Sequence, residues 1–279
     1  MPIVFAAALS HAPGITAWRA AASDDQREHI DAAFATLGDG LASAVPELVV
    51  LLTSEHWTNF FLDHIGAFCV GRNDAFRGPV EPWLGIEPVS VPGAPQLAEA
   101  LIEQLYGDGF EVNFGYELEL DHGSMVPLHY LTPAMNVPVI PIFFNTLAAP
   151  QPSAQRCYGL GRAIGAFLAR TPQRVALVAT GGMSHDPGEL RHGIIDSAFD
   201  RRFLAQMAAG DAAALTAYRN ADFAAAGAGA FELLSWIALR GAIGGVPGHA
   251  LAYEAVVPWA TGIGLMAFDV APVRAESAA

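Results

Sequence analysis

Short apolar segments alternate with helical patterns along most of the chain. The apolar segments are rich in Val and Ile, and several are apolar at every position, which is typical of parallel strands covered by helices on both sides. They predict strands at residues 2–9, 47–53, 65–70, 137–144, 174–180 and 262–269. We interpret 2–9 as a buried strand and not as a signal-peptide core, because no cationic region leads into it.

Between these strands, apolar residues recur with the period of an amphipathic helix. Ser23 and Gln26 have the spacing of a capping box, and the helix that they open has one apolar face. Two more helices are expected after Pro95 and Pro152. The three apolar faces consist of Ile30, Phe34, Leu37 and Leu41, of Leu97, Leu101 and Leu105, and of Leu160, Ile164 and Phe167.

This alternation predicts an α/β fold, a three-layer sandwich in which helices flank a mostly parallel central sheet. The Pro/Gly-rich stretches 71–95 and 145–153 are neither long nor polar enough for linkers, so we expect loops within a single domain that spans residues 1–279. Residues 204–244 are helical in pattern and Ala-rich, and they are expected to form a small helical lobe beside the sheet.

Composition excludes several classes of function. The 279 residues are 53% hydrophobic and carry a formal net charge of −14, so the chain can bury a large core and repels nucleic acid. Its apolar runs are too short to span a bilayer. Cys69 and Cys157 lie far apart and are expected to be buried, reduced thiols of a cytoplasmic protein. The low charge density favours a homo-oligomer over a monomer.

Three histidines follow predicted strands directly. His11 comes after strand 2–9, His56 after strand 47–53, and His185 after strand 174–180. Ligands of open α/β sheets bind beyond the carboxyl ends of the strands. Each histidine alone is typical of a hydrogen-bonding surface residue, whereas the three together are equally consistent with a binding site.

The other histidines differ in their sequence context. His122 follows Asp121 and precedes a glycine, which makes it a fourth candidate for chemistry. The remaining five histidines lie in a helical pattern or have no motif around them, so we expect surface or packing roles for them: His29, His64, His129, His192 and His249. Thr180, Gly181 and Gly182 precede His185, and glycines there would allow backbone to approach a ligand closely.

Glu232 is a carboxylate in an otherwise apolar helical segment, residues 229–237. Burial of an unpaired carboxylate is costly, so we expect either an arginine partner such as Arg240 or a metal ion. Two imidazoles and one carboxylate form the facial triad of non-haem Fe(II) oxygenases, and the same groups can hold a catalytic zinc. The residue types do not choose between these metals.

Motifs for other chemistry are weak. The glycines at 159, 161 and 165 resemble a dinucleotide-binding loop, but they lie in a helical pattern, where small-residue packing is the better interpretation. The chain has no P-loop, and the residues around Ser184 do not form the G-x-S-x-G elbow of hydrolases.

At these residues the chain resembles the type III extradiol ring-cleaving dioxygenases, the LigB superfamily, from Ser10 to about Asp269. Members include the catalytic subunit of protocatechuate 4,5-dioxygenase and 2,3-dihydroxyphenylpropionate dioxygenase. Five landmarks occur in the order of the family: Leu9-Ser10-His11-Ala12-Pro13, Pro46–Val50 leading to Ser54-Glu55-His56, Asp121-His122-Gly123, Pro138–Phe143, and Thr180–His185. The family often has aspartate where this chain has Glu55.

The resemblance implies a non-haem Fe(II) site and a role for each candidate. His11, His56 and Glu232 would bind the metal, His185 would be the base, and His122 would be a second acid/base or oxygen-positioning residue. The reaction would open a catechol-type ring with O2 and give a muconic semialdehyde-type product. Residues near the ring would include Trp57, Thr180, Gly181 and Gly182, with Phe60, Phe61 and Trp259 as further candidates for the pocket wall.

Two alternatives stay open. A zinc hydrolase could use the same three ligands to activate water, and a non-catalytic relative could keep the fold as a binding module. Some relatives act with a small subunit that covers the active site, so an accessory subunit is a candidate partner unless the lobe at 204–228 replaces it. The ring substituent of the substrate, and any arginine or hydroxyl that contacts it, are not determined at this level.

Overall fold

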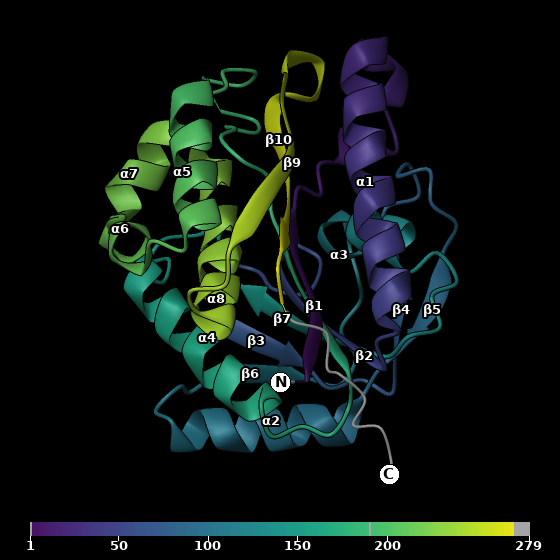
Figure 1. The fold of residues 1–279 in the computed structure, drawn as a ribbon, viewed down its shortest axis with the longest axis vertical. Coiled ribbons are helices and arrows are strands. Elements are labelled where there is room, and N and C mark those ends of the chain that lie inside the picture. The colour runs from purple at the N-terminus through teal and green to yellow at the C-terminus, as the bar shows by residue number, and fades with distance from the viewer. Residues whose placement is uncertain (1, 190, 271–279) are drawn as a thin grey trace.

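A computed structural model describes residues 2–189 and 191–270, and its centre is one eight-stranded sheet (Figure 1). The strand order is β6-β3-β7-β2-β8-β1-β10-β9. The strands are β1 (Ile3–Leu9), β2 (Leu48–Ser54), β3 (Phe68–Gly71), β6 (Asn113–Gly115), β7 (Val139–Phe144), β8 (Val175–Thr180), β9 (Gly248–Val256) and β10 (Thr261–Phe268). The four middle strands, from β7 to β1, run parallel, while β3, β10 and β9 pair antiparallel with their inner neighbours.

Helices cover both faces of the sheet, as Figure 1 shows. One core lies under α2 (Pro95–Gly107), α4 (Ala154–Leu168), α5 (Ser197–Ala209) and α8 (Leu233–Ile243), and the other lies under α1 (Asp24–Ala44) and α3 (His122–Leu131). Alternate residues of a strand belong to different cores: Leu177 of β8 packs into the first and Val178 into the second. The predicted three-layer α/β sandwich is confirmed.

The helix that follows the predicted capping box is α1, and its start is formed as expected. The Ser23 hydroxyl accepts a hydrogen bond from the Gln26 amide at 3.3 Å, and the Gln26 side chain accepts one from the Ser23 amide at 3.4 Å. The four apolar residues of its predicted face are all buried. Cys69 and Cys157 are also buried and unpaired, and burial raises the pKa of the Cys69 thiol to about 12.

Several elements were not expected. The predicted loop 71–95 contains two paired strands, β4 (Ala75–Gly78) and β5 (Val89–Pro92), which at four residues each are too short to show a pattern. Helix α3 contains Pro127, and β9 is a half-exposed strand at the edge of the sheet, so neither has the regular apolar period of its class. No helix among the described residues is long and apolar enough to cross a membrane.

The expected helical lobe is only partly separate from the sheet. Its segments are the end of α5, α6 (Ala212–Ala217), α7 (Asn220–Ala226), the 3-10 helix η3 (Ala228–Glu232) and α8. Helix α8 packs closely on α4 and on β8 and is therefore part of a covering layer. The glycines of the suspected dinucleotide motif lie inside α4, where Gly161 faces the backbone of Ala238 in α8. Small-residue packing is the correct interpretation of that motif.

The contact between Gly161 and Ala238 predicts different effects for glycine-to-alanine substitutions at positions 161 and 159 of α4. A Cβ atom on Gly161 would overlap the Ala238 carbonyl, whereas one on Gly159 would meet only the Phe110 ring at 3.4 Å. We expect Gly161→Ala to lower the free energy of unfolding by about 1–3 kcal/mol through overpacking. Gly159→Ala should leave it unchanged or raise it by up to about 1 kcal/mol, because alanine favours the helix. Urea unfolding of both variants measures the difference, and equal values would contradict the observed α4–α8 packing.

Candidate active site

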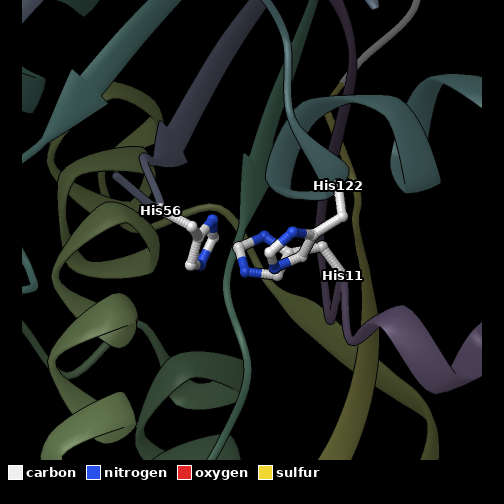
Figure 2. A group of neighbouring side chains, drawn as sticks. All are labelled: His11, His56 and His122. Carbon is white, nitrogen blue, oxygen red and sulfur yellow. The ribbon is translucent and has the colours of Figure 1, made fainter. Parts of the chain in front are cut away.

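The candidate residues converge at the carboxyl edge of the parallel strands. His11 and His56 follow β1 and β2, and β8, which leads to His185, lies between these two strands. His122 is the first residue of α3, and Glu232 is the last residue of η3, just before α8. Figure 2 shows the rings of His11, His56 and His122 close together, although they come from three separate elements. All five side chains line one cavity of about 500 Å³.

Glu232 is the centre of this group. Its Oε2 lies 2.9 Å from His11 Nε2, and its Oε1 lies 3.3 Å from His56 Nε2 and 3.6 Å from His185 Nε2. The ligand atoms of His11, His56 and His122 also lie within 4.8 Å of one another. The distances therefore allow two overlapping sets of candidate metal ligands, one with Glu232 and one with His122 as the third member.

Hydrogen bonds to Nδ1 orient the two histidines that both sets share. His11 Nδ1 lies 3.1 Å from the Thr180 hydroxyl, and His56 Nδ1 lies 3.1 Å from Asp121 Oδ2. Asp121 also accepts hydrogen bonds from the His56 amide at 2.8 Å and from the Gly123 amide at 2.9 Å. Donation from Nδ1 leaves Nε2 of each ring as the atom that faces the cavity, as in metal sites whose histidines are held by outer hydrogen bonds.

The donor atoms fit a metal cation. His11 Nε2 is buried and has no hydrogen-bond partner among the described residues, although it faces a carboxylate oxygen. A nitrogen lone pair and a carboxylate repel each other unless a proton or a metal ion lies between them. Ligands at about 2.1 Å from one ion and at right angles are about 3 Å apart, which is close to the separations that Glu232 makes with His11 and His56.

Charges around the site are strongly coupled. Burial alone would raise the pKa of Glu232, but positive charge on His11 and His185 and hydrogen bonds from the histidines lower it well below its usual range. Burial alone would lower the pKa of His56, but Asp121 and Glu232 raise it well above its usual value. Burial alone would also raise the pKa of Asp121, but the charge of His56 and the hydrogen bonds from it lower that pKa below its usual range. The two carboxylates are therefore ionised and require positive charge, from protons or from a metal that displaces them.

His185 and His122 are also fixed through Nδ1. His185 Nδ1 donates to the Met183 carbonyl at 2.8 Å, so Nε2 is the ring nitrogen that faces Glu232 and the cavity. His122 Nδ1 lies 2.7 Å from Glu81 Oε1, and that oxygen also accepts the His122 amide at 3.1 Å. Burial and the charge of His56 lower the pKa of His122, which favours the neutral ring. Glu81 was not expected from the sequence, where it stands 41 residues away in a segment without a motif.

The residues expected near the substrate lie at different depths. Trp57 lines the cavity, is 42% exposed and has a positive φ of 60°, an uncommon conformation that occurs often near functional sites. Gly182 also lines the cavity, and its amide donates to Glu232 Oε2. Gly181 lies behind it, where a Cβ would be 2.8 Å from the Glu232 carbonyl. Thr180 is fully buried and contacts His11, so it lies below the cavity wall.

Other expectations need correction or an addition. Arg240 does not pair with Glu232, because its guanidinium donates to the carbonyls of Met207, Gly244 and Val246. Phe60 packs against Phe143 and is not among the residues that line the cavity, whereas Trp259 is. The five histidines that were assigned surface or packing roles are all exposed, and one of them, His192, also lines the cavity: His29, His64, His129, His192 and His249.

The Glu55 side chain is hydrogen-bonded to the backbone of the turn that follows β2. Its carboxylate accepts a hydrogen bond from the Trp57 amide at 3.0 Å and further bonds from the Thr58 and Asn59 amides. The carboxylate therefore fixes the turn that presents His56 and Trp57. It does not face His11 or Glu232 in the cavity and is not part of either ligand set.

Comparisons with known proteins agree with this geometry. The chain is 38% identical to a 2,3-dihydroxyphenylpropionate/2,3-dihydroxicinnamic acid 1,2-dioxygenase of Photorhabdus laumondii over 162 residues, 57% of this chain and half the length of that relative. Dioxygenases of the same name are 27% identical in Dechloromonas aromatica, over 85% of this chain and 90% of the relative, and 29% identical in Burkholderia vietnamiensis, over 79% and 84%.

The solved structures and the family comparison extend over more of the chain. The crystal structure of an uncharacterized Escherichia coli protein superposes with a TM-score of 0.57 at 18% identity, over 94% of this chain and 98% of the other, which supports the fold. Residues 5–264 match the model of the catalytic LigB subunit of aromatic ring-opening dioxygenase. The chain therefore belongs to the LigB family of aromatic ring-opening dioxygenases.

Proposed function

We propose that this protein is an extradiol dioxygenase that opens a catechol-type ring with O2 at an Fe(II) ion held by His11, His56 and Glu232. The observation that carries the proposal is the position of the buried Glu232 carboxylate between the inward-facing Nε2 atoms of the two histidines. These three residues form the ligand composition of the non-haem Fe(II) facial triad. The muconic semialdehyde-type product follows from cleavage beside the diol.

Iron is favoured over zinc by the reaction class of the family. When bound, Fe(II) exchanges electrons with the diol and O2 and keeps coordination positions open for both. Zinc has no redox chemistry, so the rival zinc hydrolase would need a separate explanation for the match to ring-opening dioxygenases. A set of three histidines, with His122 in place of Glu232, is the other ligand arrangement that the distances allow.

Proton transfer is the task of the two remaining histidines. His185 Nε2 faces the cavity as an acceptor because Nδ1 is bound to the Met183 carbonyl, so it can take a proton from a catechol hydroxyl. His122, fixed by Glu81, presents its other nitrogen to the same cavity and can position O2 or donate a proton when the ring opens. Trp57 and Gly182 line the same cavity and would border the ring.

Thr180 and Gly181 serve the metal ligands and not the substrate. The Thr180 hydroxyl lies 2.9 Å from the Gly123 carbonyl, to which it can donate while it accepts from His11 Nδ1. Gly181 allows the backbone to pack against Glu232 without a side chain between them. The homo-oligomer, the accessory subunit and the cytoplasmic location stay predictions.

The first test separates metal binding from proton transfer. We expect His56→Ala and Glu232→Ala to lose most of their iron after anaerobic reconstitution, because each removes a ligand. His185→Ala should keep its iron and lose about 10²- to 10⁴-fold in turnover of catechols, the usual contribution of a general base. Metal analysis and oxygen uptake on the same samples give both values.

His122→Ala serves as the matched comparison, since its ring lies as close to His11 and His56 as a ligand would. Retention of iron by His122→Ala and its loss from Glu232→Ala is the expected result. The reverse result would replace the facial triad with three histidines, and stoichiometric zinc without oxygen uptake would favour the hydrolase.

A second test concerns the outer hydrogen bonds. Asp121→Asn keeps an N-cap for α3 but removes the charge that orients His56, and we expect it to weaken iron binding by about 10- to 100-fold. Glu81→Gln makes the same chemical change beside His122 and should leave iron affinity near that of the wild type while it lowers turnover. Anaerobic iron titration and circular dichroism measure affinity and folding. Equal iron affinities for the two variants would show that His56 needs no support from Asp121.

A further inference from the structure

The described residues that line the active-site cavity include no arginine or lysine. The charged groups that line it are the carboxylates of Glu189 and Glu232 and the imidazoles of His11, His56, His122, His185 and His192. No arginine of residues 2–189 and 191–270 is among the lining residues, and the sequence contains no lysine. Glu232 and four of the histidines belong to the proposed metal centre, so the rest of the wall holds one carboxylate, Glu189, and one imidazole, His192, whose Nδ1 accepts a hydrogen bond from the Gly188 amide.

The arginines nearest in sequence to lining residues are bound elsewhere. Arg19 follows the lining residue Trp18, but its guanidinium donates to Asp31 at 2.6 Å and to the Ile15 carbonyl at 3.0 Å. Arg191 precedes His192, but it donates to the Ala225 carbonyl at 2.6 Å. Arg19 is paired with the Asp31 carboxylate, Arg191 is directed to the Ala225 carbonyl, and neither arginine is among the residues that line the cavity.

Aromatic surface forms another part of the wall. Trp18 and Trp259 both line the cavity, and the Trp259 indole nitrogen donates to the Trp18 carbonyl at 2.9 Å. Trp18 is 53% exposed and stacks on Trp83, with ring centroids 5.3 Å apart, and Trp83 in turn lies 6.4 Å from the His122 ring. Gly14 makes room for Trp259, because a Cβ there would overlap the indole. Aromatic surface therefore extends outward from the group of histidines around Glu232.

Two threonine hydroxyls, those of Thr146 and Thr261, also belong to residues that line the cavity. Thr146 Oγ1 is buried and has no hydrogen-bond partner among the described residues. A hydroxyl can bond to a neutral oxygen or nitrogen of a ligand, but it does not offset the cost of removing a carboxylate from water. The other lining hydroxyl, Thr261, already donates to the Gly262 carbonyl at 3.1 Å.

We propose that this cavity selects catechols whose ring substituent is uncharged and apolar, and that it discriminates against catechols that bear a carboxylate. The proposal rests on the proposed ring-opening function and specifies its substrate class. An anionic substituent would enter a space with an acidic side chain and no guanidinium, whereas an apolar one would gain contact with Trp18 and Trp259. The named substrates of the curated relatives, dihydroxyphenylpropionate and dihydroxicinnamic acid, carry carboxylates, so this chain would differ from them.

The test uses two substrates of nearly equal shape. 2,3-Dihydroxyphenylpropionate and its methyl ester differ in charge, and unsubstituted catechol reports the activity of the metal centre itself. We expect kcat/KM for the ester to exceed that for the acid by at least about 10-fold, since a single desolvated charge costs more than the 1.4 kcal/mol that this factor represents. Oxygen uptake measures turnover, and quenching of tryptophan fluorescence under anaerobic conditions measures Kd for the same compounds without turnover.

Two pairs of variants identify the residues that determine the preference between ester and acid. Glu189→Arg should lower the ratio of kcat/KM for the ester to kcat/KM for the acid at least 5-fold. Glu189→Gln should lower this ratio less, because only the arginine adds a cation that can pair with the carboxylate of the acid. Trp18→Ala should raise the Kd of the ester more than that of catechol. Thr146→Val should change acid and ester alike. A selective loss of the acid in Thr146→Val would identify Thr146 as an anion anchor and overturn the proposal.

The outcomes separate the two proposals. If catechol is opened but the acid equals or exceeds the ester in kcat/KM, the substrate class is wrong while the ring-opening function holds. If none of the three compounds consumes oxygen in the iron-loaded protein, the proposed function fails, and the anaerobic Kd values still decide the charge preference. An ester that binds and reacts better than the acid supports the proposal.

Discussion

The structure depends on the burial of one carboxylate. Glu232 is 4% exposed, and a carboxylate removed from water in this way is tolerated only where positive charge and hydrogen-bond donors surround it. Four histidines, supplied by separate elements, meet around it or beside it, and the Gly182 amide donates to one of its oxygens. Neither the imidazoles nor the carboxylate are stable there alone, so the site is formed only when the whole sheet edge and η3 are in place.

The fold satisfies this constraint by close backbone packing. Gly161 and Gly165 allow α8 to lie directly on α4, and Gly181 allows the segment after β8 to lie against Glu232. A side chain at Gly161 or Gly165 would push α8 away from α4, and one at Gly181 would push Glu232 away from the segment after β8. The strand ends set the positions of His11 and His56, while the small residues set the distance of Glu232 from them. The separations at the metal centre are thus determined partly by contacts on the far side of α8.

Much of this could be predicted from the sequence. The buried strands and α1 have strong periodicity, so their elements and the strand-end position of His11, His56 and His185 followed from pattern alone. Residues that act through tertiary contacts gave no such signal. Glu81 reaches His122 from a loop, Arg240 binds carbonyls and not Glu232, and Thr180 contacts His11 and not the cavity. These partners depend on distances between elements, which one sequence does not encode in any local pattern.

The residues proposed for catalysis and those proposed to select the substrate lie in different parts of the cavity. The proposed metal ligands and proton carriers come from the parallel strand ends, η3 and α3, where hydrogen bonds to Nδ1 orient each histidine ring. The outer wall comes from the segments that carry Trp18, Glu189 and Trp259, which hold none of those bonds to the histidines. Its charge can therefore change without disturbing the donors around Glu232. Under the proposed function, relatives that share the inner set could accept anionic or neutral substrates according to this outer wall, and the described wall of this chain, which holds no guanidinium, is the basis for assigning it neutral ones.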